Sequence, residues 1–207
     1  MTVHVFLHDE YSDWELGYLL PELRTAPAVP EIPKSPRRVS TFSLDGGPVV
    51  SAGGLRVTPD RALEDVANLT GHDVAAVVLP GGTFWEDLAA EELLSLVESV
   101  GRSGAIVAAI CAGTGFLART GLLDGALHTS NSASFLEQRA PNYRGQARYR
   151  DELAVRDGNV VTASGLGAIE FAKEMLLALE VYPASVVDVW YRAFRHGISP
   201  FAKRQPD

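Results

Sequence analysis

Short runs of consecutive apolar residues recur along the chain, separated by amphipathic or glycine-rich segments. Strands in a parallel sheet that is covered on both faces have this composition, because both sides of each strand are buried. The runs predict strands at VHVFL (3–7), DVAAVVL (73–79), AIVAAI (105–110) and NVVTASG (159–165). Two further stretches, RVSTFSL (38–44) and GLRVTPD (54–60), flank a glycine-rich turn and predict one or two more strands.

Helical periodicity describes most of the intervening segments. In SDWELGYLLPELR (12–24), leucines recur at the spacing of one helix face, and Pro21 predicts a kink or an early end. The other predicted helices are RALEDVANL (61–69), EELLSLVESVGRSG (91–104), CAGTGFLARTGLL (111–123), GAIEFAKEMLLALE (167–180) and PASVVDVWYRAFRHG (183–197). The proline-rich segment TAPAVPEIPKSPRR (25–38) has no periodicity and predicts a surface loop.

The alternation of strands and helices predicts an α/β fold, a doubly wound three-layer sandwich around a mostly parallel sheet. A chain of 207 residues is of the size that one core serves, so we expect a single domain over residues 1–207. Ligands of such folds bind beyond the carboxyl ends of the strands. Four segments lie there: HDE (8–10), PGGTFW (80–85), CAGT (111–114) and SGLG (164–167).

Charge and composition narrow the range of partners. A net charge of -8 and a pI near 5.1 argue against nucleic acid or an anionic membrane as partner. No apolar run reaches the ~18 residues that span a bilayer, and no targeting segment is recognised, so we expect a cytoplasmic protein. The single cysteine excludes an internal disulfide framework, and the five histidines lack metal-ligand spacing, so we expect no metal and no cofactor.

Cys111, the single cysteine, lies between the predicted strand 105–110 and a predicted helix. A nucleophile on such a turn projects outward, and a helix N-terminus favours the thiolate. Gly81 and Gly82 end a neighbouring strand and can bring backbone N–H groups to the same point. We therefore predict an oxyanion hole formed by the amides of Gly82 and Ala112. The alternative is that Cys111 is a small buried apolar residue.

Four motifs, in order, carry a family resemblance: DWEL (13–16), LPGG (79–82), AAICAGTGFLARTGLL (108–123) and ASGLGAIEFAKEML (163–176). Together they resemble the ThiJ/PfpI superfamily over nearly the whole chain. This superfamily has the class I glutamine amidotransferase-like fold, a flavodoxin-like sandwich, and includes intracellular proteases or amidases and redox-responsive stress proteins. The resemblance implies that Cys111 is the reactive residue.

The resemblance also implies a role for Glu15, which stands where the family keeps a glutamate that touches the nucleophile. A carboxyl beside a thiolate should have a raised pKa, because like charges repel, and could donate a hydrogen bond to sulfur. Gly82 and Ala112 match the oxyanion positions of the family. The chain departs from the pattern at Ala112, where the protease-like branch has a histidine, and at Ser130 and Asn131, where other branches place one. It also lacks a late His–Glu pair, so glutamine amidotransferase activity is not expected.

These departures leave the identity of a general base open. His128 lies three residues from Asn131 and could approach the site if its loop curls inward, and His8 lies at the correct edge of the predicted sheet. For each, the alternative is a surface or edge histidine without a catalytic role. The other residues expected to line a substrate pocket are Gly81, Thr114, Asn131, Trp85 and His8.

Three functions are compatible with this sequence. The first is a cysteine-dependent hydrolase or lyase, of amidase/protease or glyoxalase/deglycase type, in which Cys111 attacks a small carbonyl or amide substrate and Glu15 carries the proton. The second is a redox-responsive stress-protection protein whose Cys111 is oxidised to sulfinate without turnover. The third is a ligand-binding module without turnover. The expected partners are a small-molecule or peptide substrate and, from the resemblance, a second copy in a homodimer. Candidate contact surfaces for the dimer are the proline-rich segment and the last predicted helix, with Trp190, Tyr191 and Phe194. The alternative is that these aromatic side chains pack on the sheet.

Overall fold

The computed structural model describes residues 2–25, 38–69, 73–86 and 90–198. Its strands are β1 (Thr2–Phe6), β2 (Arg38–Ser43), β3 (Val49–Val50), β4 (Arg56–Val57), β5 (Arg61–Ala62), β6 (Val74–Leu79), β7 (Ile106–Ile110), β8 (Ala154–Asp157) and β9 (Val160–Ala163). Its α-helices are α1 (Asp13–Leu16), α2 (Leu19–Thr25), α3 (Leu63–Ala67), α4 (Glu91–Arg102), α5 (Gly113–Ala118), α6 (Ala133–Arg139), α7 (Ala168–Ala178) and α8 (Ala184–His196). Short 3-10 helices are η1 (Phe84–Glu86), η2 (Leu122–Asp124) and η3 (Gln146–Arg148).

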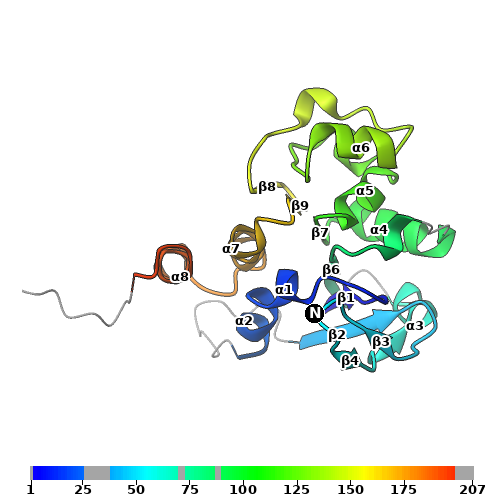
Figure 1. The fold of residues 1–207 in the computed structure, drawn as a ribbon, viewed down its shortest axis with the longest axis horizontal. Helices are drawn as coiled ribbons and strands as arrows, with labels where there is room; N and C mark the ends of the chain where they lie inside the picture. The colour runs from blue at the N-terminus through cyan, green and yellow to red at the C-terminus, as the bar shows by residue number, and fades with distance from the viewer. Residues whose placement is uncertain (1, 26–37, 70–72, 87–89, 199–207) are drawn as a thin grey trace, which may run out of the picture.

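A seven-stranded sheet in the order β5-β2-β1-β6-β7-β9-β8 forms the centre of the structure (Figure 1). Neighbouring strands are parallel except for β8 and β9, which are antiparallel. From β1 the chain first builds outward through β2 to β5 and then returns to add β6 on the other side. Ligands of doubly wound folds bind at such a reversal, so the ends of β1 and β6 are the place to look for a site.

Helices cover both faces of this sheet and complete the predicted three-layer α/β sandwich, which is confirmed (Figure 1). On β7, Val107 and Ala109 pack into the core beneath α3, α4, α5 and α6, whereas Ala108 and Ile110 pack into the core beneath α1, α2, α7 and α8. The strand is therefore buried on both sides, which explains why its sequence shows no polar alternation.

The structure corrects several predicted elements. The helix expected over residues 12–24 is two helices that separate at Gly17, not at Pro21. Pro21 lies in the first turn of α2. Backbone N–H groups in a first turn have no acceptor within the helix, so a proline there costs no helical hydrogen bond. The antiparallel edge strand β8 and the helix α6 were not predicted. Most of the proline-rich segment, residues 26–37, lies outside the described residues.

The C-terminal helix α8 lies on the outer side of α7 (Figure 1). The Glu22 side chain links α2 to this C-terminal region. Glu22 on α2 accepts hydrogen bonds of 2.8 Å from both the Tyr182 hydroxyl and the Trp190 indole N–H. Trp190 is thus used within the chain, while Phe194 is 51% exposed. Among the described helices, none has the length and apolar character that crossing a membrane requires.

The core on the α7 side predicts a stability difference between two leucines. Leu176 is fully buried in this core and Leu166 is 89% exposed. Leu176→Ala should lower the free energy of unfolding by about 2–5 kcal/mol, because it leaves a cavity. Leu166→Ala, the same chemical change, should alter it by no more than about 0.5 kcal/mol. Urea unfolding followed by circular dichroism measures both, and equal losses would contradict the described packing.

Candidate active site

Cys111 occupies a sharp turn between β7 and α5. Its φ of 56° lies in the left-handed region, which is strained for a residue with a side chain. The turn is fixed on both sides: the Cys111 amide donates to the Ala163 carbonyl at 2.9 Å, and the Cys111 carbonyl accepts from the Thr114 hydroxyl at 2.6 Å. A Cβ at Gly113 would lie 2.5 Å from the Leu79 carbonyl oxygen, so the close packing of this turn on β6 requires glycine.

Glu15 on α1 reaches Cys111 across Gly81. Its side chain is completely buried, and its Oε2 accepts a hydrogen bond from the Gly81 amide at 2.6 Å. No nitrogen or oxygen of the described residues hydrogen-bonds to Oε1. A Cβ at Gly81 would lie 2.6 Å from Cys111 Cβ and 2.8 Å from each carboxyl oxygen. Only glycine leaves the space in which the carboxyl and the thiol meet.

Both acidic groups have raised pKa values, and burial is the main cause for each. Burial raises the pKa of Glu15 above its ordinary value. Burial, followed by the negative charge of Glu15, raises the pKa of the Cys111 thiol to about 11. The expectation that a helix N-terminus would favour the thiolate is therefore not met: α5 has only six residues, and burial and Glu15 outweigh it. At neutral pH the pair retains at least one proton.

Asn131 contacts the sulfur from the other side. Its Nδ2 donates to Cys111 Sγ at 3.4 Å, and its Oδ1 accepts from the Gly165 amide at 2.9 Å. The Gly165 bond fixes the amide orientation that turns Nδ2 toward sulfur. A Cβ at Gly165 would lie only 2.9 Å from Sγ, so this position also needs glycine. Gly165 was not among the predicted site residues, although its SGLG segment was recognised as a strand end.

The amides of Gly82 and Ala112 border the space in front of the sulfur. The Ala112 N–H lowers the pKa of Cys111, although less than burial raises it. Gly82 has a φ of 141° and pairs with Tyr11 in an isolated antiparallel bridge. Gly82 and Ala112 line the same cavity as Cys111.

A cavity of about 660 Å³ leads to the sulfur. Its lining residues come from the β1–α1 loop, the β3–β4 hairpin and the two strand ends: Asp9, Glu10, Ser12, Trp14, Val50, Ser51, Ala52, Gly82, Thr83, Cys111 and Ala112. Sequence reasoning missed Trp14, which is 55% exposed, and the whole hairpin wall. Trp14 stands next to Glu15 in DWEL, so a signal was present. No feature of the sequence indicated that the β3–β4 hairpin would line the site.

Two predicted pocket residues, Thr114 and Trp85, have structural contacts instead of lining this cavity. Thr114 is fully buried, and its hydroxyl lies 2.6 Å from the Ser130 hydroxyl behind the turn. Trp85 donates its indole N–H to the Pro80 carbonyl at 2.8 Å and packs against Phe116. It lines a separate cavity that shares Gly82 and Ala112 with the first.

The structure brings neither candidate histidine into reach of the sulfur. His128 is fully buried and uses Nδ1 on the Ala126 carbonyl (2.7 Å) and Nε2 on the Tyr143 hydroxyl (2.5 Å). His8 lies behind Gly82 and uses Nδ1 on the Asp9 carbonyl at 2.8 Å. Burial lowers the pKa of both histidines, so they are neutral at pH 7. The segment that contains His128 does bring Asn131 to the sulfur, but the His128 ring is held by Ala126 and Tyr143 instead.

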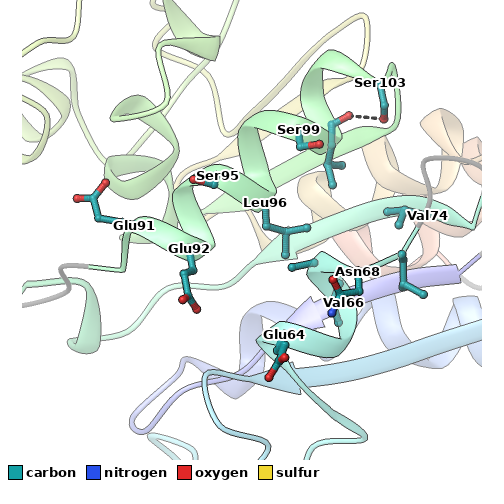
Figure 2. A pocket seen from close by; sticks show the side chains of 13 residues that line it. Glu64, Val66, Asn68, Val74, Glu91, Glu92, Ser95, Leu96, Ser99 and Ser103 are labelled. Atoms are coloured by element: carbon teal, nitrogen blue, oxygen red, sulfur yellow. Dashed lines mark hydrogen bonds between the residues drawn. The ribbon is translucent and has the colours of Figure 1, made fainter.

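A larger cavity, of about 770 Å³, lies between α3 and α4, away from Cys111 (Figure 2). Ser95, Ser99 and Ser103 follow one side of α4, and Glu64, Glu91 and Glu92 lie toward the other end of the cavity (Figure 2). Within the described part of the chain, no group of three or more His, Cys, Asp or Glu side chains could hold a metal ion. The cavity at Cys111 is therefore the better candidate for chemistry.

The chain is similar to known proteins over most of its length. The family described as the DJ-1/PfpI family matches residues 1–178. The chain is 34% identical over 190 residues to "Uncharacterized protease YoaZ" of Bacillus subtilis, covering 92% of this chain and 89% of that protein. It is 33% identical over 137 residues to "Glutathione-independent glyoxalase DJR-1.2" of Caenorhabditis elegans, covering 64% of this chain and 68% of that protein.

The fold is also similar to a solved structure. The crystal structure of the thiJ/pfpI family protein from Bacillus anthracis matches with a TM-score of 0.85 and 32% identity, covering 96% of this chain and 92% of that one. The chain therefore belongs to the DJ-1/PfpI family.

Proposed function

We propose that this protein is a cysteine-dependent enzyme acting on small carbonyl compounds, with Cys111 as nucleophile. The observation that carries the proposal is the meeting of Cys111 and the buried carboxyl of Glu15 beside Gly81, where the charge of Glu15 raises the pKa of the thiol. A cavity of about 660 Å³ gives a small molecule access to this pair. The amides of Gly82 and Ala112 would stabilise the oxygen of the bound carbonyl.

The first step needs only the groups at this site. The thiol proton passes to Glu15 Oε1 while sulfur adds to the carbonyl carbon, so that one C–S bond forms and the C=O π bond breaks. The electron pair of that π bond moves to oxygen, where the two amides support the charge. Glu15 then returns the proton to that oxygen, and the product is a hemithioacetal or hemithioketal. The carboxyl thus acts first as general base and then as general acid.

Carbonyl addition suits this site better than amide cleavage. Cleaving an amide requires a second proton donor for the departing amine, and a base for the water that releases the acyl group. His128 and His8 are held by other contacts and cannot supply either. One relative carries the name of a glutathione-independent glyoxalase, which supports a carbonyl substrate. The protease name of another supports an amidase or protease activity, for which the geometry offers less.

We further propose that the protein works in the cytoplasm as a homodimer, without nucleic-acid or membrane partners. The net charge of -8 supports the absence of polyanionic partners. The exposed side of α8, with Phe194 at 51% and Val189 at 47% exposure, supports a contact between two copies. Sedimentation of the purified protein measures the oligomeric state.

Removal of the sulfur should abolish turnover. Cys111→Ala is expected to reduce consumption of small aldehydes and dicarbonyls to the uncatalysed rate, because no other thiol is present in the chain. The assay follows loss of each carbonyl compound, together with a panel of amides. Thermal unfolding serves as the folding control. Full activity in a folded Cys111→Ala protein would contradict the proposal, and turnover confined to amides would replace it with an amidase.

Replacing Glu15 should change turnover and thiol reactivity in opposite directions. Glu15→Gln removes the charge that raises the pKa of Cys111, so more thiolate forms at pH 8 and alkylation by iodoacetamide should become several-fold to about tenfold faster. Carbonyl turnover should fall to background, because glutamine cannot carry the proton. In the unmodified protein, with a thiol pKa of about 11, the alkylation rate should rise about tenfold per pH unit between pH 7 and 10.

The matched control for this variant is Glu92→Gln, which changes an exposed glutamate on α4. It should leave both the alkylation profile and the turnover unchanged. If Glu15→Gln slows alkylation as well as turnover, the proposed coupling between carboxyl and thiol is wrong.

A second candidate function is oxidant sensing by Cys111. It is favoured by the donors around the sulfur, since Asn131 Nδ2 at 3.4 Å and the Ala112 amide could hold oxygens added to it. With hydrogen peroxide, the thiolate would lose two electrons to form a sulfenate and water, and a second peroxide would give the sulfinate. The high thiol pKa opposes this reaction, because the thiolate is the reacting species.

Peroxide treatment separates the two functions. We expect intact mass after brief, dilute peroxide at pH 7 to remain that of the reduced protein, with oxidation appearing only at alkaline pH. Rapid, stoichiometric gain of two oxygen atoms at pH 7, without carbonyl turnover, would instead establish the sensing function.

A further inference from the structure

The cavity that leads to Cys111 carries negative charge on one wall. Asp9 and Glu10 are the only charged side chains among the described residues that line it. Both carboxylates are anchored to neighbouring segments: Asp9 Oδ1 accepts from the Val50 amide at 2.8 Å, and the Glu10 carboxylate accepts from the Thr83 hydroxyl. Each of these bonds uses one oxygen, so the other oxygen is left for a ligand or solvent.

The backbone at this wall is held in an unusual conformation. Glu10 has a φ of 59°, in the left-handed region that side chains disfavour, and its amide donates to the Val50 carbonyl at 2.7 Å. Strain of this kind is maintained only where the surroundings fix it. The β3–β4 hairpin supplies that support, because Val50 bonds to both Asp9 and Glu10. The two carboxylates are thus set in place before any ligand arrives.

An aromatic surface lines the same cavity. Trp14 extends from α1 with 55% of its surface exposed, beside the buried Glu15 in sequence. The face of an indole ring attracts cations at short range. Carboxylates attract the same ligands over a longer range. The charge and the aromatic surface therefore favour the same class of ligand, one with a positive group.

Two arginines line a neighbouring cavity instead. Arg119 and Arg139 line a space of about 350 Å³ that shares Gly82 and Ala112 with the Cys111 cavity but does not include Cys111. Each guanidinium lies over an aromatic ring, 5.3 Å from the centre of Phe116 for Arg119. The cavity that Cys111 lines therefore has no positively charged side chain among its described lining residues.

We propose that Asp9, Glu10 and Trp14 make this site selective for cationic molecules over anionic ones, so that its substrates are small carbonyl compounds bearing an amine or another positive group. The substrate class rests on the proposed carbonyl chemistry. The charge selection itself depends only on access to the thiol, so it is measurable without turnover.

Thiol-specific methanethiosulfonates of similar size and different charge test this selection. The thiolate attacks the sulfenyl sulfur of the reagent, forms a mixed disulfide and releases methanesulfinate. The three probes are the 2-(trimethylammonio)ethyl, the methyl and the 2-sulfonatoethyl reagents, and intact mass follows their reaction with Cys111. Each rate is divided by the rate with 2-mercaptoethanol in the same buffer, which removes intrinsic differences in reactivity.

The normalised rates should fall in the order cationic, neutral, anionic. At about 20 mM salt we expect the cationic reagent to react about tenfold faster than the anionic one, with the ratio falling to about two in 0.5 M sodium chloride, because salt screens exposed carboxylates. The double variant D9N/E10Q should bring the ratio near one at low salt, since both amides retain the hydrogen-bond acceptors that fix the wall.

The matched control is E91Q/E92Q, which removes the same two negative charges from exposed positions on α4. It should keep the tenfold preference, which separates the cavity wall from the net charge of the protein. Equal normalised rates for the cationic and anionic reagents, or an equal loss of preference in both double variants, would overturn the charge selection while leaving the carbonyl chemistry intact. Failure of all three reagents to modify Cys111 would overturn both.

Discussion

The candidate site depends on the missing side chain at Gly81. This residue lies between two acids, and its amide fixes the Glu15 carboxyl at 2.6 Å while its bare Cα allows the carboxyl to approach the thiol. Two buried acids at this separation cannot both ionise without a large electrostatic cost. The proton that this pair retains is the central chemical feature of the site. It keeps Cys111 mainly in the thiol form, and the neighbouring Glu15 carboxyl can accept that proton and return it.

Sheet topology brings these groups together from distant parts of the sequence. Glu15 follows β1, Gly81 follows β6 and Cys111 follows β7, and these strands are neighbours in the sheet. The apolar runs were sufficient to predict the strands, and the strand-to-helix position of Cys111 predicted its turn. Glu15 came from the family resemblance, because one acid in a short helix carries no signal of its own. Edge elements such as β8 and α6 escaped prediction, since their burial patterns are set by tertiary contacts.

The acidity of the thiol and the direction of the His128 ring could not be predicted from the sequence. Sequence position suggests a helix N-terminus acting on sulfur, but the balance between that effect and burial depends on how closely Glu15 and the sheet enclose the site. Likewise, His128 is near Asn131 in sequence, yet its ring is turned to Ala126 and Tyr143. A residue that is close in sequence to a site residue has its backbone near the site. The direction of its side chain depends instead on which hydrogen-bond partners are available.

A protonated thiol–carboxyl pair makes reactivity depend on the incoming molecule. A sulfur with a pKa of about 11 reacts slowly with reagents that need a preformed thiolate. An electrophile whose oxygen takes up the proton as the C–S bond forms avoids that cost, because Glu15 can transfer the proton during the step. Carbonyl compounds take up the proton on oxygen during the addition, whereas peroxide reacts with a thiolate that must form first. The same buried pair that weakens Cys111 as a general nucleophile therefore favours it in the addition chemistry that the cavity and the two amides can support.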